Sequence, residues 1–368
     1  MSNSLLTIDM ITRKSLEILE NNLVITRNVN RQYDDSFAVE GAKIGSTLRI
    51  RLPDRALVTD GAALQVQDDN EQFTTLTVSS QKHIGINFTS AELTMQLDDF
   101  AERVLKPRIS QLASTVDADV ANAYKLIGNS VGTPGVAPAT ALVNGLSGFF
   151  NPTDVISRQF KNGMMGEQVL GYEEVNMSQS IKVHTCGTRA ATGNTTGAAV
   201  TSEGATTLTL TVGSGETINA GDVFTIADCY AANPQTREST GSLFQFVALS
   251  SSTSSTTATV TVAPMYSAGN ALCTMVTLPA TGKAVVFVGA ASTSYPQNMV
   301  YHRDAIAFAT ADLLLPQGVD MASRAVHNGI SLRVVRQYDI NNDRMPCRVD
   351  VLYGYNTIRP QMGCRIWG

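Results

Sequence analysis

The amino-acid sequence predicts an α+β protein in which one long helix supports an extended two-stranded ribbon and a separate β-rich module. Residues 89–129 carry apolar side chains at the three-and-four spacing of a buried helix face. Residues 42–88 alternate apolar and polar side chains, and residues 184–288 form short alternating runs between Gly, Ser, Thr and Asn clusters. At 368 residues, the chain exceeds the usual size of a single core, so several domains are expected.

The composition excludes some function classes. Charged residues make up 16% of the chain, against about a quarter in typical soluble proteins, and the net charge is -5 without a Lys/Arg run. Binding to nucleic acid through phosphate neutralisation is therefore not expected. Five cysteines without a CxxC pair indicate reduced thiols. Because neither a signal peptide nor an apolar run of about 20 residues is evident, we expect a protein made and kept inside a cell, with no membrane partner.

Residues 1–36 are predicted to be an N-terminal arm with one short helix. Thr7 or Asp9 is a candidate cap, and Asn21 with Asn22 marks the end. Its narrow apolar stripe consists of Ile11, Ile18 and Leu19. A segment this short cannot bury the stripe alone, so it should lie on the rest of the molecule or on a neighbour.

Residues 37–90 are predicted to form a long two-stranded ribbon with a charged tip. Leu48, Ile50 and Leu52 alternate with polar residues in the first strand, and the run from Leu76 to Phe88 does the same in the second. A lone two-stranded ribbon is only marginally stable in water, so this one needs a surface to lie on. The candidate intersubunit contact residues are its charged side chains: Arg49, Arg51, Arg55, Asp60, Asp68, Asp69 and Glu71.

Residues 91–129 are predicted to be mostly one helix. Pro107 predicts a kink near residues 103–107 or two helices in tandem, and Gly128 with Asn129 predicts a left-handed stop. Unbroken from Asp98 to Ile127, the helix would be about 45 Å long. The face expected to be buried comprises Leu97, Phe100, Ala101, Val104, Leu105, Ile109, Leu112, Ala113, Val116, Val120, Ala123, Tyr124 and Ile127.

The remaining chain divides into three parts. Residues 130–183 are a Gly/Pro-rich connection with a short helix at 153–161, and residues 184–288 hold only about eight charged residues in the pattern of a small antiparallel barrel or sandwich. The inner face of this module is expected to comprise Leu208, Leu210, Val223, Ile226, Phe244, Phe246, Val260 and Val262. Residues 289–368 return to mixed structure, with a helix at 302–314, three strands after it, and a buried Trp367.

The sequence offers no pattern typical of catalysis, cofactor binding or metal binding. The four histidines lack HxH, HExxH or HxxxH spacing, and GxSxG and Walker motifs are absent. Acidic pairs such as Asp68 with Asp69 lie in turn-rich segments, where a solvated cluster is the simpler interpretation. We therefore expect a structural protein with no catalytic, cofactor or metal site.

The order of these parts resembles the major capsid proteins of tailed double-stranded DNA bacteriophages, which share the Hong Kong 97-type fold. The resemblance is to the coat proteins of short-tailed phages that carry an inserted β-barrel. It is carried by RKSLEILENNLVITRNVNRQYDDSFAVEGAKIGSTLRIRLP, FTSAELTMQLDDFAERVLKPRISQLASTVDADV, FKNGMMGEQVLGYEEV, HRDAIAFATADLLLPQGVD and GISLRVVRQYDINNDRMPCRVDVLYGYNTIRP.

The resemblance implies an N-terminal arm (1–36), an extended β-hairpin loop with part of the peripheral domain (37–90) and the spine helix of the peripheral domain (91–129). It further implies part of an axial domain (130–183), an inserted β-barrel domain (184–288) and a return to the axial and peripheral domains with C-terminal strands (289–368). The stretch between spine and insert is shorter than this family usually has, which suggests a reduced axial domain or one completed after the insert.

The implied function is a virion shell protein that assembles in the host bacterial cytoplasm into an icosahedral capsid of hexamers and pentamers. Scaffolding and portal proteins are the expected partners, and the shell would enclose double-stranded DNA without sequence-specific binding. The alternatives are an encapsulin-type bacterial compartment, which the inserted barrel disfavours, and a β-rich surface adhesin, which lacks a signal and does not explain the long helix. An enzyme is the third alternative.

Overall fold

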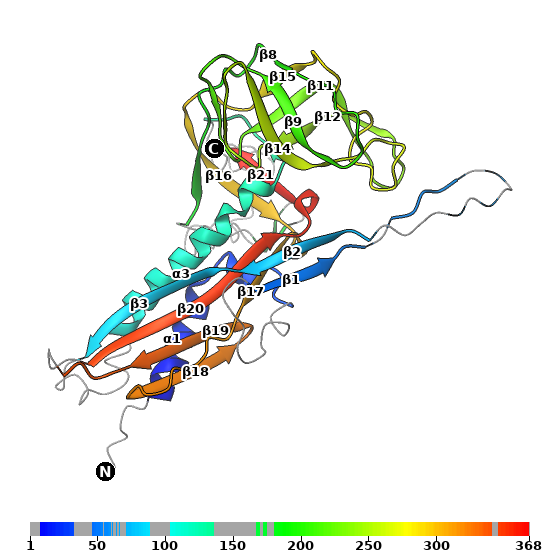
Figure 1. Cartoon of the computed structure of the whole chain (residues 1–368). Coiled ribbons are helices and arrows are strands. Elements are labelled where there is room, and N and C mark those ends of the chain that lie inside the picture. The colour runs from blue at the N-terminus through cyan, green and yellow to red at the C-terminus, as the bar shows by residue number, and fades with distance from the viewer. Residues whose placement is uncertain are drawn as a thin grey trace, which may run out of the picture.

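The computed structural model describes residues 8–32, 46–88 (except 54, 60, 62–63, 65 and 67–70), 104–135, 167–169, 172–174, 180–340 and 345–367. In these ranges the protein has mixed α and β structure in which strands predominate (Figure 1). The predicted helix at 153–161 and the helical residues before 104 lie outside the described residues. None of the described helices has the length and apolar character that a bilayer crossing requires.

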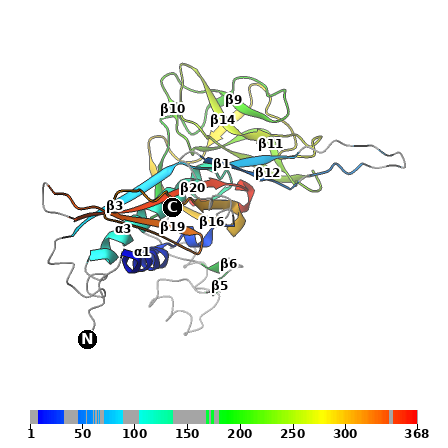
Figure 2. The same cartoon turned by 60° about the horizontal axis from the view of Figure 1, so that its bottom comes forward.

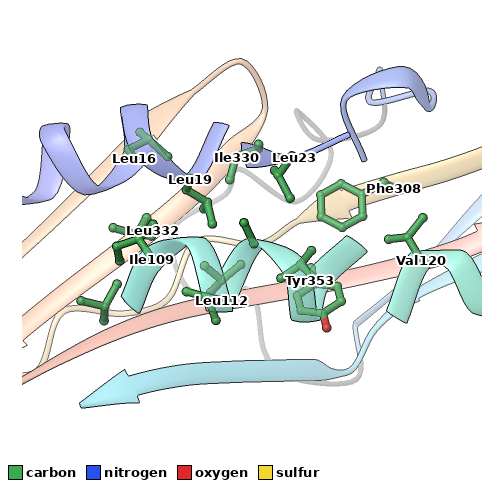
Figure 3. Close-up of a cluster of buried hydrophobic side chains, with 14 of the residues drawn as sticks. Leu16, Leu19, Leu23, Ile109, Leu112, Val120, Phe308, Ile330, Leu332 and Tyr353 are labelled. Carbon is green, nitrogen blue, oxygen red and sulfur yellow. The ribbon is translucent and has the colours of Figure 1, made fainter. Parts of the chain in front are cut away.

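A five-stranded antiparallel sheet forms the centre of the body. Its order is β17 (Ile306–Thr310), β20 (Met345–Thr357), β19 (Ile330–Arg336) and β18 (Met321–His327), while β3 (Ser80–Phe88) also pairs with β20. Two helices, α1 (Ile8–Asn22) and α3 (Lys106–Ala121), lie together on one face of this sheet (Figure 2). Apolar side chains of both helices and of the sheet form the main core (Figure 3).

The predicted N-terminal helix is present and lies on the same chain. Ile11 and Leu19 of its stripe are buried, Ile18 packs beside them, and the helix contacts α3, β18 and β19. The Asp9 carboxylate accepts a hydrogen bond from Ser323 Oγ at 2.6 Å, so it anchors the helix to β18. A short 3₁₀ turn, η1 (Thr26–Asn28), follows the helix.

The buried face predicted for the spine is confirmed from Leu105 to Ile127, but its C-terminal end differs from prediction. Pro107 lies in the first turn of α3, directly after a π-helical turn at residues 104–105, and in a first turn its missing N–H costs no hydrogen bond. After Ala121 the chain tightens into η5 (Asn122–Leu126), which ends at an extended Ile127.

The predicted left-handed stop at Gly128 and Asn129 is wrong, because neither residue has a positive φ. Gly128 instead lets two backbones approach: a Cβ atom there would lie 2.8 Å from the carbonyl oxygen of Gln245.

The ribbon consists of β1 (Ser46–Arg51) and β2 (Phe73–Val78), paired from Ser46 with Val78 to Arg51 with Phe73. Its base lies against the sheet, where Ile50, Leu76 and Val78 pack on Ala307, Ala309 and Leu352. Gly354 permits this crossing, since a Cβ atom there would meet Thr77 O at 2.2 Å. The assignment of residues 80–88 to the ribbon is wrong: they form β3, which pairs with β20 along its whole length.

A second sheet connects the body to the β-rich module. It has the order β4 (Ser130–Val131), β21 (Gly363–Trp367), β16 (Ser294–Tyr301) and β7 (Lys182–Thr185), with η7 (Pro360–Met362) before β21. A separate hairpin joins β5 (Glu167–Val169) to β6 (Tyr172–Glu174). The predicted burial of Trp367 is confirmed at 1% exposure.

The predicted helix at 302–314 is wrong. Residues 303–305 form the 3₁₀ turn η6 (Arg303–Ala305), and β17 follows with all five residues buried. Ile306 and Phe308 enter the main core, while Ala307 and Ala309 face the ribbon base. A strand buried on both faces is a continuous apolar run, which periodicity cannot distinguish from a buried helix.

The strands predicted in residues 184–288 are confirmed and pair among themselves. The sheet order is β12 (Ser239–Val247), β11 (Val223–Ala232), β15 (Ala284–Phe287), β8 (Asn194–Thr196), β9 (Ala205–Thr211) and β14 (Thr257–Met265). The outer strands meet after β12, where Leu249 N donates to Thr261 O at 2.8 Å. A small sheet of β10 (Thr217–Ile218) and β13 (Ser252–Thr253) lies beside them.

The inner face predicted for this module agrees with the structure at every residue except Val223. Six of the eight predicted residues are in its core, and Phe244 packs against it. Val223 instead belongs to a separate cluster with Cys186, Tyr295 and Trp367. The chain enters and leaves the module at neighbouring points, since Arg189 Nη2 donates to Val288 O at 3.0 Å.

Candidate functional site

The ribbon is the first candidate site, because it projects away from the body beyond its packed base (Figures 1 and 2). Arg51 Nη1 lies 3.3 Å from Glu71 Oε2, and both side chains are mostly exposed. The Arg49 guanidinium lies over the Phe73 ring, 4.9 Å from its centroid. Exposed pairs of this kind add little to stability, so these four side chains remain available to a neighbour.

The other predicted contact residues are only partly placed. Arg55 is half-buried, and the adjacent Ala56 carbonyl accepts a hydrogen bond from Arg237 Nη2 at 3.3 Å, which links the ribbon to the β-rich module. Asp60, Asp68 and Asp69 lie outside the described residues.

The sequence analysis missed apolar contact candidates on the ribbon. Val58, Leu64 and Val66 are 82%, 90% and 84% exposed, respectively. Scattered exposed apolar residues are ordinary on a protein surface, but three within nine positions of one projecting segment are not. The signal was present in the sequence as aliphatic residues between the acidic ones.

The second candidate site is a buried polar cluster at the joint between the body and the β-rich module. Its centre is Asp222, which is fully buried at the start of β11. Oδ1 of Asp222 lies 3.0 Å from His184 Nε2 and 3.4 Å from Arg189 Nη2. Oδ2 accepts hydrogen bonds from the backbone N–H groups of Gly187 and Asn219 at 3.2 and 2.9 Å.

These contacts determine the ionisation of Asp222. Burial alone would raise its pKa, but the hydrogen bond from His184 and the positive charge of Arg189 outweigh burial and lower the pKa below its usual value. The carboxylate therefore stays charged and holds β7, the start of the module and β11 in one arrangement.

The cluster also brings together three groups of the kinds that bind metals. His184, Cys186 and Asp222 are buried, and their ligand atoms lie within 4.8 Å of one another. Burial raises the pKa of the Cys186 thiol, whereas a metal ligand must be a thiolate. Both Asp222 oxygens are already engaged, and the Arg189 guanidinium lies beside them. The residues present therefore do not fit a metal ion.

Three further residues, Tyr124, Arg365 and Trp367, close this cluster from the body. Tyr124, on η5, places its hydroxyl 3.4 Å from His184 Nδ1, and Trp367 packs edge-on against His184 and Tyr295. Arg365, fully buried on β21, donates from Nη1 to Gly221 O at 2.8 Å. Sequence analysis predicted the burial of Tyr124 and Trp367 but not this network, because its members are separated by up to 243 positions, from Tyr124 to Trp367.

The chain matches a family described as "P22 coat protein - gene protein 5" over residues 139–368. Among solved structures, it is similar to a chain from Mycobacterium phage Che8 at 13% identity, covering 94% of this chain and 90% of that chain with a TM-score of 0.37. It is also similar to the mature capsid of bacteriophage PhiM1 at 11% identity, covering 90% and 83%, with a TM-score of 0.36.

A third similar structure is the capsid of Cyanophage P-SCSP1u, at 10% identity, covering 90% of this chain and 84% of that chain, with a TM-score of 0.32. No curated protein matches the chain. The family match includes the whole β-rich module and the β7, β16 and β21 strands of the second sheet, and it extends over more than half of the sequence. The chain therefore belongs to the P22 coat protein family and is a structural major capsid protein of a tailed bacteriophage.

Proposed function

We propose that copies of this chain assemble into an icosahedral shell of hexamers and pentamers that encloses packaged double-stranded DNA. In this proposal the described parts act as those of a Hong Kong 97-type subunit. The segment around α1 is the N-terminal arm, β1 and β2 form the extended loop, and α3 is the spine. Residues 184–288 form an inserted β-barrel domain, and the flanking segments 130–183 and 289–368 supply the axial and peripheral domains.

The observation that carries the proposal is the ribbon beyond its base. Ile50, Leu76 and Val78 are buried against the body, whereas Val58, Leu64 and Val66 are almost fully exposed. A projecting segment with exposed aliphatic side chains gains little from packing on its own chain. It is explained if it lies across a neighbouring subunit, where repeated contacts of one kind close into a symmetric shell.

The net charge of the subunit supports a shell that encloses DNA without binding it tightly. With a net charge of -5, the subunit lacks the electrostatic attraction that dominates non-specific DNA binding. We further propose that scaffolding and portal proteins guide assembly in the host bacterial cytoplasm and that the chain has no enzymatic activity.

A deletion tests the proposal. Replacing residues 55–72 with a short turn removes the projecting part of the ribbon but leaves its packed base. We expect a folded subunit, with an unchanged circular dichroism spectrum, that fails to form shells by negative-stain microscopy and sedimentation. Normal particles from this variant would show that the ribbon is dispensable for assembly.

A milder variant tests whether the apolar side chains of the ribbon, rather than its length, are needed for assembly. Leu64→Ser combined with Val66→Ser changes two side chains that are 90% and 84% exposed, so the melting temperature should not change. Shell yield should fall if a neighbour buries them. Val326→Ser, at a 56% exposed position on β18, is the matched control for loss of a surface aliphatic group. An equal loss of shells in the control would refute a specific role of the ribbon.

A further inference from the structure

Arg365 is an unusual buried charge. The side chain is fully buried, and its Nη1 donates to Gly221 O at 2.8 Å. Its Nε and Nη2 atoms have no hydrogen-bond partner among the residues described, and no described carboxylate forms an ion pair with it. Buried guanidinium groups are normally paired, because an uncompensated charge in the interior costs several kcal/mol.

The surrounding groups do not neutralise this charge. Asp222 is the only carboxylate described within the cluster, and it already accepts from His184, Arg189, Gly187 and Asn219. Burial raises the pKa values of the Tyr124 hydroxyl and the Cys186 thiol, so both are neutral at pH 7. Two guanidinium groups therefore share one negative charge.

The aromatic neighbours compensate only in part. The Arg365 guanidinium carbon lies 5.7 Å from the ring centroids of both Tyr124 and Trp367, at the outer limit of cation–π attraction. Burial lowers the pKa of Arg365 to about 10, which still leaves the side chain charged at neutral pH.

The two unpartnered atoms point to a ligand class. Nε and Nη2 lie along the same edge of the planar guanidinium group, and their parallel N–H bonds form the fork that grips a carboxylate or another small anion. Trp367 Nε1 and Gln297 Oε1 are also unpartnered, but they are a complementary donor and acceptor on paired residues, and one bridging water would satisfy both. The Arg365 fork offers donors only, and it carries a charge.

We propose that the Arg365 fork binds a small monovalent anion, a halide or a planar oxyanion, between β21 and the β-rich module. The anion would restore neutrality to a cluster that includes η5, β7 and the start of β11. It would thereby act as a removable part of the joint between body and module, which makes the joint sensitive to the kind of salt and not only to ionic strength.

The first test compares the unfolding rate constant of the full chain in sodium chloride with that in sodium gluconate at the same ionic strength. Gluconate is too large for a buried site. An anion that binds only the folded state increases its stability in proportion to the logarithm of the anion concentration. The unfolding rate constant should therefore be lower in chloride than in gluconate, by about threefold or more. Arg365→Met should abolish this difference, whereas Arg27→Met, at an exposed arginine, should keep it.

The second test needs no variant and therefore covers the case in which Arg365→Met does not fold. Crystals of the wild-type chain soaked in bromide should show an anomalous peak within about 3.5 Å of Arg365 Nε and Nη2. A water-like peak without anomalous signal, or equal unfolding rates in chloride and gluconate, would overturn the proposal.

Discussion

Replacing Asp117 with alanine should detach the N-terminal segment from the spine helix. Asp117 lies on the buried face of α3 and is 2% exposed. Its Oδ1 accepts from Thr26 N at 3.0 Å and from Thr26 Oγ1 at 2.5 Å, and its Oδ2 accepts from Val24 N at 2.6 Å and from Ile25 N at 3.3 Å. One carboxylate thus holds the whole turn between α1 and η1.

The size of the effect follows from what the substitution leaves behind. The two Thr26 donors are buried, and a buried donor without an acceptor costs about 1–3 kcal/mol. The Val24 and Ile25 donors are only partly buried, so water can replace much of their loss. We therefore expect Asp117→Ala to lower the free energy of unfolding by about 3–5 kcal/mol, in the range for breaking a buried charged interaction.

Urea unfolding of the unassembled subunit, followed by circular dichroism, measures this change. Gln111→Ala, at an exposed position of the same helix, is the control and should change stability by only a few tenths of a kcal/mol. Hydrogen exchange should show faster amide exchange in residues 8–30 of the Asp117 variant. A loss below about 1 kcal/mol would refute the role of the carboxylate as the anchor of this turn.

Three other predictions follow from the joint and the module. Gly128→Ala should destabilise the subunit, because its Cβ would lie 2.8 Å from Gln245 O, whereas Gly85→Ala, with no atom within 4 Å of its Cβ, should be neutral in the same thermal melt. The lowered pKa of Asp222 contributes stability that is complete above about pH 4 and is lost as pH falls through the folded-state pKa, so acid unfolding should be steeper in wild type than in Asp222→Asn. Residues 184–288 expressed alone should give a β-rich circular dichroism spectrum, and proteolysis as fast as that of an unfolded control would contradict this.

Much of the fold could be predicted because burial follows local periodicity there. The stripe of α1 and the face from Leu105 to Ile127 repeat at three and four residues, and the strands of the β-rich module alternate with period two. The pattern failed at residues 306–310, where both faces of β17 are covered. It also failed at Ser80, where a strand leaves the ribbon and joins the central sheet without any change in period.

The buried charges could be predicted less well. Asp117 has a local signal, since it follows Val116 and precedes Val120 on an apolar helix face. Asp222 and Arg365 have none, because a charged residue in a strand or turn is usually exposed. The approach of β21 to the start of β11 joins residues 144 positions apart through the Arg365 bond to Gly221, and no local sequence pattern signals it.

The position of this cluster has a physical reason. A module that the chain enters and leaves at neighbouring points can swing about that joint unless contacts on several sides hold it. Apolar packing by Val223 and Trp367 supplies attraction at the joint, but it is not directional and would tolerate small rotations. Hydrogen bonds from Arg189, His184 and Arg365 are directional, and a rotation of the module would break them inside the protein. The buried polar contacts therefore fix the orientation of the module on the body more closely than apolar packing alone would.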